Sequence, residues 1–199
     1  DVVSIAPNAF SGSLYLKTLT FADSKAALAA DGSNALIIGE SAFSDTEALT
    51  SVTIPVRTTS IGRAAFASSN VETVVFEDDC AIQTISEAMF WSCSRLSSVV
   101  IPKNVTSIDN GAFINCSRLQ TVTFAAGGSS VQLYADATSY SSSTIPGSST
   151  YAKYGVFQYC KMLETIDFNG RFGGTVIGPY TFYECNKLSE LMLGNVKVE

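Results

Sequence analysis

Apolar residues recur along the chain in one fixed order, I-x-x-x-A-F-x-x-C-x-x-L-x-x-V-x-I, with polar residues between them. Residues 108–124 follow this order closely, and six further copies carry the same central phenylalanine. The seven anchors are Phe10, Phe43, Phe66, Phe90, Phe113, Phe157 and Phe182. Their spacings are 33, 23, 24, 23, 44 and 25 residues, so a unit of about 23 residues is interrupted by insertions. The period predicts a solenoid, in which each coil covers the apolar face of the next.

The spacing of apolar residues changes within each unit. The segment 121–124, TVTF, alternates with a period of two, which is typical of a strand with one buried face. The Ala-Phe part advances in steps of three to four and predicts a helical or 3₁₀ turn. A second extended stretch is expected at 58–61 and 105–108, on the other side of each coil. Each coil should add one strand to a parallel sheet with a spacing of about 4.8 Å.

The copies are not all intact. The third lacks one residue after Phe66, and the segment EDDCAIQTI before Ile85 restores the phase. Two longer insertions are expected near 22–37 and 125–153. We therefore predict a single domain over 1–199, built from about seven repeats.

Several segments resemble a known family. IGESAF at 38–43, IGRAAF at 61–66 and SVVIPKNVTSIDNGAFINCSRLQTV at 98–122 are similar to the BspA-type leucine-rich repeat. The resemblance implies a right-handed leucine-rich-repeat solenoid, mostly β with short helical or 3₁₀ turns and a parallel sheet on its concave face. It also implies a microbial surface or secreted protein with a role in adhesion. The usual asparagine ladder of leucine-rich repeats is absent, because Arg57, Gly127 and Arg171 occupy its position.

Composition narrows the possible partners. The chain has 199 residues, 46% of them hydrophobic and only 15% charged, with a formal net charge of −6. A nucleic-acid partner is therefore not expected. No apolar run reaches the roughly 18 to 20 residues that cross a bilayer, so we expect no membrane insertion of this fragment. The start, DVVSIAPNAF, has no leader pattern, which favours a mature or excised chain.

Four of the five cysteines share one repeat position, three residues after the phenylalanine. They are Cys93, Cys116, Cys160 and Cys185, and earlier copies place Ser or Thr there. A position that accepts Cys, Ser or Thr predicts a tight buried site with free thiols. Disulfides between neighbouring coils are the alternative. Cys80 lies outside the phase and is expected to be exposed.

The sequence offers little catalytic or metal chemistry. It contains no histidine and no C-x-x-C pair, so the common nucleophile–base pairs and zinc sites are missing. The acidic run 77–79 suggests a solvated surface rather than a cation site. We expect no enzyme, no metal and no cofactor. The sequons at Asn104 and Asn115 matter only in a secreted eukaryotic protein.

Candidate binding residues point outward from the predicted strands, eight and ten residues after each phenylalanine, or seven and nine in the shortened third copy. They are Thr18, Thr20, Ser51, Thr53, Thr73, Ser98, Thr121, Thr123, Thr165 and Asp167, and the remaining outward positions hold Val75, Val100, Glu190 and Met192. Such residues suit any exposed sheet. They would equally form a contact surface for a protein or a glycan, or an ice-binding array.

Two further surfaces are candidates. The Ser-, Gly- and Tyr-rich insertion offers aromatic anchors at Tyr134, Tyr140 and Tyr151, although it could be a tolerated loop. Trp91, Ile114 and Tyr183 follow the phenylalanine directly and could form an apolar patch. The expected function is a non-enzymatic cell-surface or secreted interaction module, binding a host or microbial surface or matrix protein. Carbohydrate or ice binding through the Thr/Ser ladder, or a structural spacer, are the alternatives.

Overall fold

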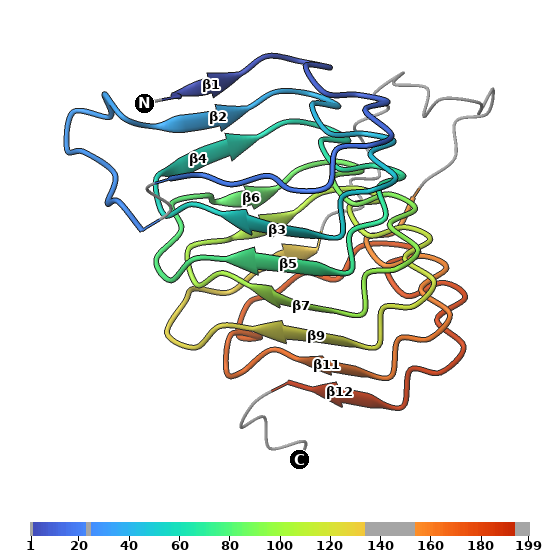
Figure 1. Ribbon diagram of the computed structural model, residues 1–199. Coiled ribbons are helices and arrows are strands. Elements are labelled where there is room, and N and C mark those ends of the chain that lie inside the picture. The colour runs from blue at the N-terminus through green and yellow to red at the C-terminus, as the bar shows by residue number, and fades with distance from the viewer. Residues whose placement is uncertain (1, 23–24, 134–153, 194–199) are drawn as a thin grey trace.

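The computed structural model describes residues 2–22, 25–133 and 154–193, which wind into a stack of flat coils (Figure 1). One side is a six-stranded parallel sheet, here called the front sheet. Its strands, in spatial order, are β3 (Ser51–Ile54), β5 (Thr73–Phe76), β7 (Ser98–Ile101), β9 (Thr121–Phe124), β11 (Thr165–Asp167) and β12 (Glu190–Met192). The predicted parallel-sheet solenoid is confirmed.

The opposite side of each coil carries short strands that form two smaller parallel sheets. The first contains β1 (Ser4–Ile5), β2 (Leu36–Ile38) and β4 (Thr58–Ile61), and the second contains β6 (Thr84–Ile85), β8 (Ser107–Ile108) and β10 (Gln132–Leu133). A parallel bridge between Leu133 and Ile177 continues the second sheet into the last coil. We call this side the back. The second extended stretch predicted at 58–61 and 105–108 corresponds to β4 and β8.

The phenylalanines form one continuous column inside the stack. Consecutive rings lie parallel, with centroids 5.2 to 5.8 Å apart and interplanar angles of 3 to 18°. The five central rings are fully buried, whereas Phe10 at one end is 40% exposed. Because each ring stacks on the rings of the coils before and after it, the solenoid has the nearest-neighbour organisation that the repeat predicted.

The turn that carries each phenylalanine is not helical, which corrects the predicted helical or 3₁₀ turn. Ala88 and Ser92, two residues either side of Phe90, have φ angles of 54° and 56°. These left-handed residues direct backbone N–H groups along the stack instead of into a helix. Thus Phe90 N donates to Ala112 O at 2.8 Å, in the next coil. The same pattern recurs from turn to turn, so hydrogen bonds through the turns join the coils in addition to the ladders of the front and back sheets.

The glycine of the IG motif has a packing role. A Cβ on Gly62 would lie 2.5 Å from the backbone nitrogen of Glu40 in the preceding coil. No real Cβ tolerates such a distance, so only glycine allows the coils to approach this closely. Gly39 is in the same position against Pro7.

The damaged third copy keeps its register in the front sheet. Val74 and Phe76 pair with Val52 and Ile54, although they follow their phenylalanine one residue early. The missing residue is therefore absorbed in the turn. The extra residues before Ile85 form a loop whose apolar part packs inward, with Cys80 and Ile82 0% and 1% exposed.

The expected insertions are shorter than their predicted bounds. Residues 36–37 already belong to β2, and β10 continues the back of the sixth coil inside the segment assigned to the second insertion. The rest of that segment, 134–153, lies outside the described residues.

Candidate functional site

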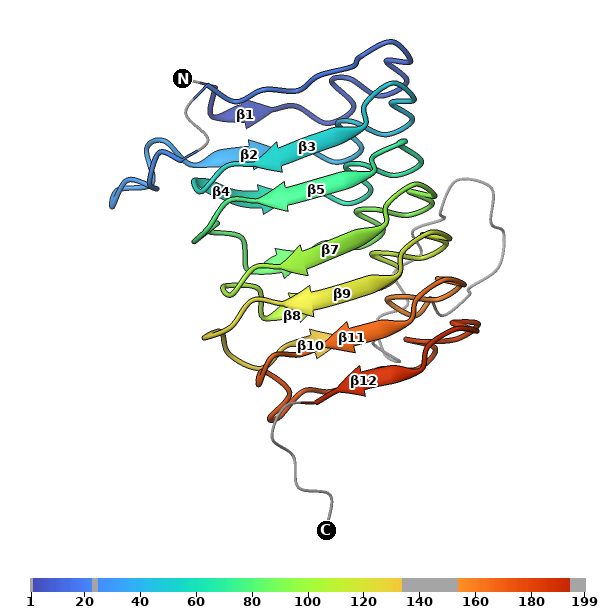
Figure 2. The ribbon, with the colours of Figure 1, turned by 60° about the horizontal axis from the view of Figure 1, so that its bottom comes forward.

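The outward side of the front sheet is the largest regular exposed face that the described strands form, and Figure 2 shows its six strands side by side. Strand alternation buries Val52, Val74, Val99, Val122 and Ile166 and turns the flanking residues outward. Two parallel rows result. The first row is Ser51, Thr73, Ser98, Thr121, Thr165 and Glu190. The second row is Thr53, Val75, Val100, Thr123, Asp167 and Met192.

The register fixes the geometry of these rows. Each first-row residue pairs directly with the next, from Ser51↔Thr73 through to Thr165↔Glu190. Neighbouring side chains in a row are therefore about 4.8 Å apart, and the two rows are separated by roughly 6.6 Å. Val75 and Val100 are the most exposed apolar residues of the early rungs, at 46% and 55%. The sequence predicted these outward positions correctly from β3 onward.

Thr18 and Thr20 lie outside the hydrogen-bonded strands of the front sheet. Both are exposed, but residues 16–21 form no strand and no ladder with β3. Leu16, Leu19 and Phe21 still pack against the core. The first coil is instead tied to the second through β1 and its turn, where Phe10 N donates to Ala42 O at 2.8 Å. Two residues of the predicted set therefore lack the backbone support of the others.

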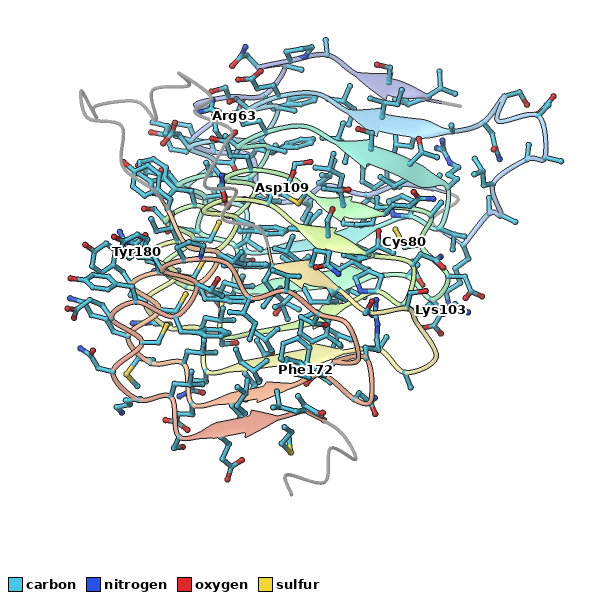
Figure 3. The ribbon with its side chains drawn as sticks, turned by 180° about the vertical axis from the view of Figure 1, so that it is seen from behind. Arg63, Cys80, Lys103, Asp109, Phe172 and Tyr180 are labelled. Atoms are coloured by element: carbon cyan, nitrogen blue, oxygen red, sulfur yellow. The ribbon has the colours of Figure 1, made fainter. Side chains whose placement is uncertain are left out.

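The predicted patch of Trp91, Ile114 and Tyr183 does not form. Trp91 is half-buried over a small alanine cluster, and Ile114 is only 3% exposed. Tyr183 is exposed and makes edge-to-face contacts with Tyr159 and Tyr180, with ring centroids 5.7 and 5.9 Å away. This tyrosine cluster lies at the turn side of the last two coils, where Figure 3 labels Tyr180. The repeat pattern does not predict this cluster, because Tyr159 and Tyr180 occupy left-handed turn positions outside the apolar phrase.

The cysteines form a buried ladder of free thiols, as favoured from the sequence. The Sγ atoms of Cys93, Cys116, Cys160 and Cys185 each donate to the carbonyl of the phenylalanine one coil earlier, all at 3.1 Å. Burial raises the pKa of Cys93 to about 12 and that of Cys185 to about 11. These thiols are therefore neutral hydrogen-bond donors rather than nucleophiles.

Cys80 is buried, contrary to the prediction that it is exposed. Its Sγ donates to Pro55 O at 3.4 Å, and burial raises the pKa of the thiol. The loop formed by the extra residues turns Cys80 and Ile82 into the core and leaves Ala81 between them partly exposed. Figure 3 labels Cys80 among the strands.

Charged groups are arranged as pairs between coils. Arg63 lies between two carboxylates, with Nη1 3.3 Å from Glu40 Oε1 and Nε 3.6 Å from Glu87 Oε1. Burial, and then the neighbouring Glu87, raise the pKa of Asp109. In the acidic run, Asp79 forms an ion pair with Lys103. Over the ranges that the structure describes, no group of three or more His, Cys, Asp or Glu residues could hold a metal ion.

The tyrosines of the insertion, Tyr134, Tyr140 and Tyr151, lie outside the described residues. The described part of the chain contains no helix that is long and apolar enough to cross a bilayer.

Stacked parallel strands, a continuous phenylalanine column and an exposed sheet face define a leucine-rich-repeat solenoid. The family model for the BspA type leucine rich repeat region matches residues 4–139 and 130–198, with 6 copies. The chain belongs to this family. Its seven stacked phenylalanines agree roughly with the matched copies.

One solved structure supports the fold, and a second is similar over part of the chain. A leucine-rich repeat protein from Bacteroides ovatus has a TM-score of 0.53 and 22% identity, covering 96% of this chain and 52% of that one. A leucine rich cell surface protein from Faecalibacterium prausnitzii has a TM-score of 0.45 and 20% identity, covering 76% of this chain and 27% of that one. The chain thus spans about half, or less, of the length of these proteins. Among curated proteins, none matches the sequence.

Proposed function

We propose that this chain is a non-enzymatic protein-binding module of a surface or secreted protein, which attaches the cell to a host or neighbouring-cell protein. The observation that carries the proposal is the two-row outward face of the front sheet, with its fixed spacing and small polar and apolar side chains. Membership of the BspA-type family supports a surface or secreted location.

A rigid sheet is a suitable base for binding. The backbone of each inner strand is hydrogen-bonded to the strands of the coils before and after it, so little conformational entropy is lost when a partner docks. Short hydroxyl side chains carry little rotamer entropy and both donate and accept hydrogen bonds. The exposed valines add apolar area that a partner can cover.

The size of the face sets a limit on affinity. Five strand spacings of about 4.8 Å and strands about 13 Å long give roughly 300 Å². Stable protein interfaces cover roughly 800 Å² on each partner. A partner must therefore also contact the flanking turns, and the tyrosine cluster of the last two coils is one such flank.

The direct test introduces a large side chain on either the front or the back of the solenoid. Thr73→Arg obstructs the front face, and Ser60→Arg on the back strand β4, where Ser60 is exposed, is the matched control. Binding is measured against an immobilised panel of matrix and cell-surface proteins. We expect the front variant to lose binding and the back variant to keep it, with unchanged circular dichroism.

Further arms of the test separate the alternatives. Replacing Tyr134, Tyr140 and Tyr151 by Ala tests whether the insertion contributes to binding. Binding confined to a glycan array would favour carbohydrate recognition, and thermal hysteresis would favour ice. No ligand at high concentration in any assay would leave the spacer role.

A further inference from the structure

The two rows of the front face change character along the solenoid axis. The first row holds hydroxyl residues in its first five positions and ends at Glu190. The second row begins with Thr53, continues through Val75 and Val100, and reaches Asp167 and Met192. None of the twelve residues is Lys or Arg. The face therefore has an apolar point near its middle and acidic groups at one end.

The apolar point consists of two adjacent valines. Thr73 and Ser98 are paired, and each valine lies two residues further along its strand. Thr53 and Thr123 flank them as the register partners of Val75 and Val100. A partner side chain over this pair would remove two exposed apolar groups from water at once.

The acidic end lies on β11 and β12. Asp167 and Glu190 are on adjacent strands with a two-residue offset, which separates them by roughly 8 Å. Glu190 Oε2 accepts a hydrogen bond from Thr165 Oγ1 at 3.4 Å, and Asp167 Oδ1 accepts one from Asn169 N at 2.7 Å. Within the part of the chain that the structure describes, neither carboxylate forms an ion pair.

The basic residues that precede these strands do not neutralise the pair. Lys161 and Lys187 are exposed in the turns before β11 and β12. Neither reaches Asp167 or Glu190 within ion-pair distance. Among the described residues, none supplies a cation to the acidic end, so it is available to a cation from a partner.

We propose that the front face binds a protein segment that places an apolar side chain over Val75 and Val100 and a Lys or Arg over Asp167 and Glu190. Three strand spacings separate the two points, which is about 14 Å. An extended segment along the axis covers this distance in about four residues, and a helix covers it in about nine. This partner chemistry rests on the protein-binding role proposed above.

The test uses a phage-displayed library of random twelve-residue peptides, selected on the wild-type chain. We expect enriched sequences to combine an apolar residue with Lys or Arg about four or nine positions away. Enriched peptides are then synthesised, and their affinities are measured at low and high salt. Enriched peptides without a cation would overturn the proposal.

Isosteric variants then separate the two contacts. Asp167→Asn with Glu190→Gln should weaken binding roughly three- to tenfold at low salt and remove most of its salt dependence. Val75→Thr with Val100→Thr should weaken it about tenfold and leave the salt dependence intact. Glu47→Gln removes an exposed carboxylate that lies in the turn before β3 and outside the two rows, and it should change neither.

The outcomes distinguish the two levels of the proposal. If Thr73→Arg abolishes peptide binding but neither pair of isosteric substitutions weakens it, the proposed partner chemistry is refuted and the binding face is retained. If Thr73→Arg leaves peptide binding unchanged, or if the selection enriches no peptide, both the partner chemistry and the binding face are refuted.

Discussion

Arg171 should be the most costly charged residue to remove, because it joins three loops in the interior of the stack. Its side chain is buried, and the residue is 2% exposed. Nε donates to Ser129 O at 2.8 Å, and Nη1 donates to Pro102 O at 3.0 Å and to Ala125 O at 3.4 Å. Nη2 donates to Val105 O, and the guanidinium lies 5.8 Å from the ring centroid of Phe124.

The magnitude follows from these acceptors. Burial lowers the pKa of Arg171, but four carbonyl acceptors favour the charged form and hold the planar fork in place. Arg171→Met leaves these carbonyls without their donor, each at a cost of about 1 kcal/mol or more. We expect a loss of about 3 to 5 kcal/mol, a large share of the stability of a typical domain. Arg171→Lys should lose about half as much, since an ammonium cannot reach every acceptor.

Urea unfolding measures this loss, followed by circular dichroism and by the fluorescence of Trp91, which is the single tryptophan. Two probes are needed because coils couple mainly to their neighbours. Arg95→Met is the matched control, since Arg95 is half-exposed and its partner Glu72 Oε1 is 2.9 Å from Nη1. It should cost less than about 1 kcal/mol. Equal losses for the two methionine variants would refute the reasoning.

Three further predictions concern the column, the thiols and the turns. Phe113→Ala should cost about 3 to 5 kcal/mol in urea unfolding, because its ring is fully buried, whereas Phe10→Ala at the exposed end should cost less than half of that; equal costs would contradict the column. Stability should fall as the pH rises from about 9 toward 12, because the pKa of Cys93 is raised from 9.0 to about 12 and the unfolded thiol loses its proton first. Cys93→Ala should make this fall shallower, and an unchanged slope would contradict the assignment. Asp45→Gly should stabilise by about 0.5 to 1 kcal/mol, because Asp45 is exposed with a φ of 54°, and Asp45→Val should destabilise; thermal unfolding of both variants tests the sign.

The strands were predictable because their pattern is local. TVTF alternates over four residues, and the same alternation at the same offset in each unit also fixes the register between coils. The one-residue deletion after Phe66 illustrates this, since Val74 still pairs with Val52. Burial of the inward side chains determines the register, and a turn can lose a residue at little cost.

The turns and the loop chemistry were not predictable in the same way. An Ala-Phe step of three to four residues fits a helix and also fits two left-handed turns, and only hydrogen bonding between coils favours the second. Cys80 lacks a repeat position, so its burial depends on how one loop folds. Arg171 was noted only as a replacement for asparagine, because its four acceptors come from loops that are far apart in the sequence.

Because the turns also carry backbone hydrogen bonds between coils, the distance between coils does not depend on the side chains that the front sheet exposes. Backbone hydrogen bonds set the distance between coils at three places, and none of them involves an outward side chain of the front sheet. Substitutions on that face can therefore alter what each coil presents while the interval between coils stays constant. Binding specificity can diverge one coil at a time in such a molecule, without the fold having to be rebuilt.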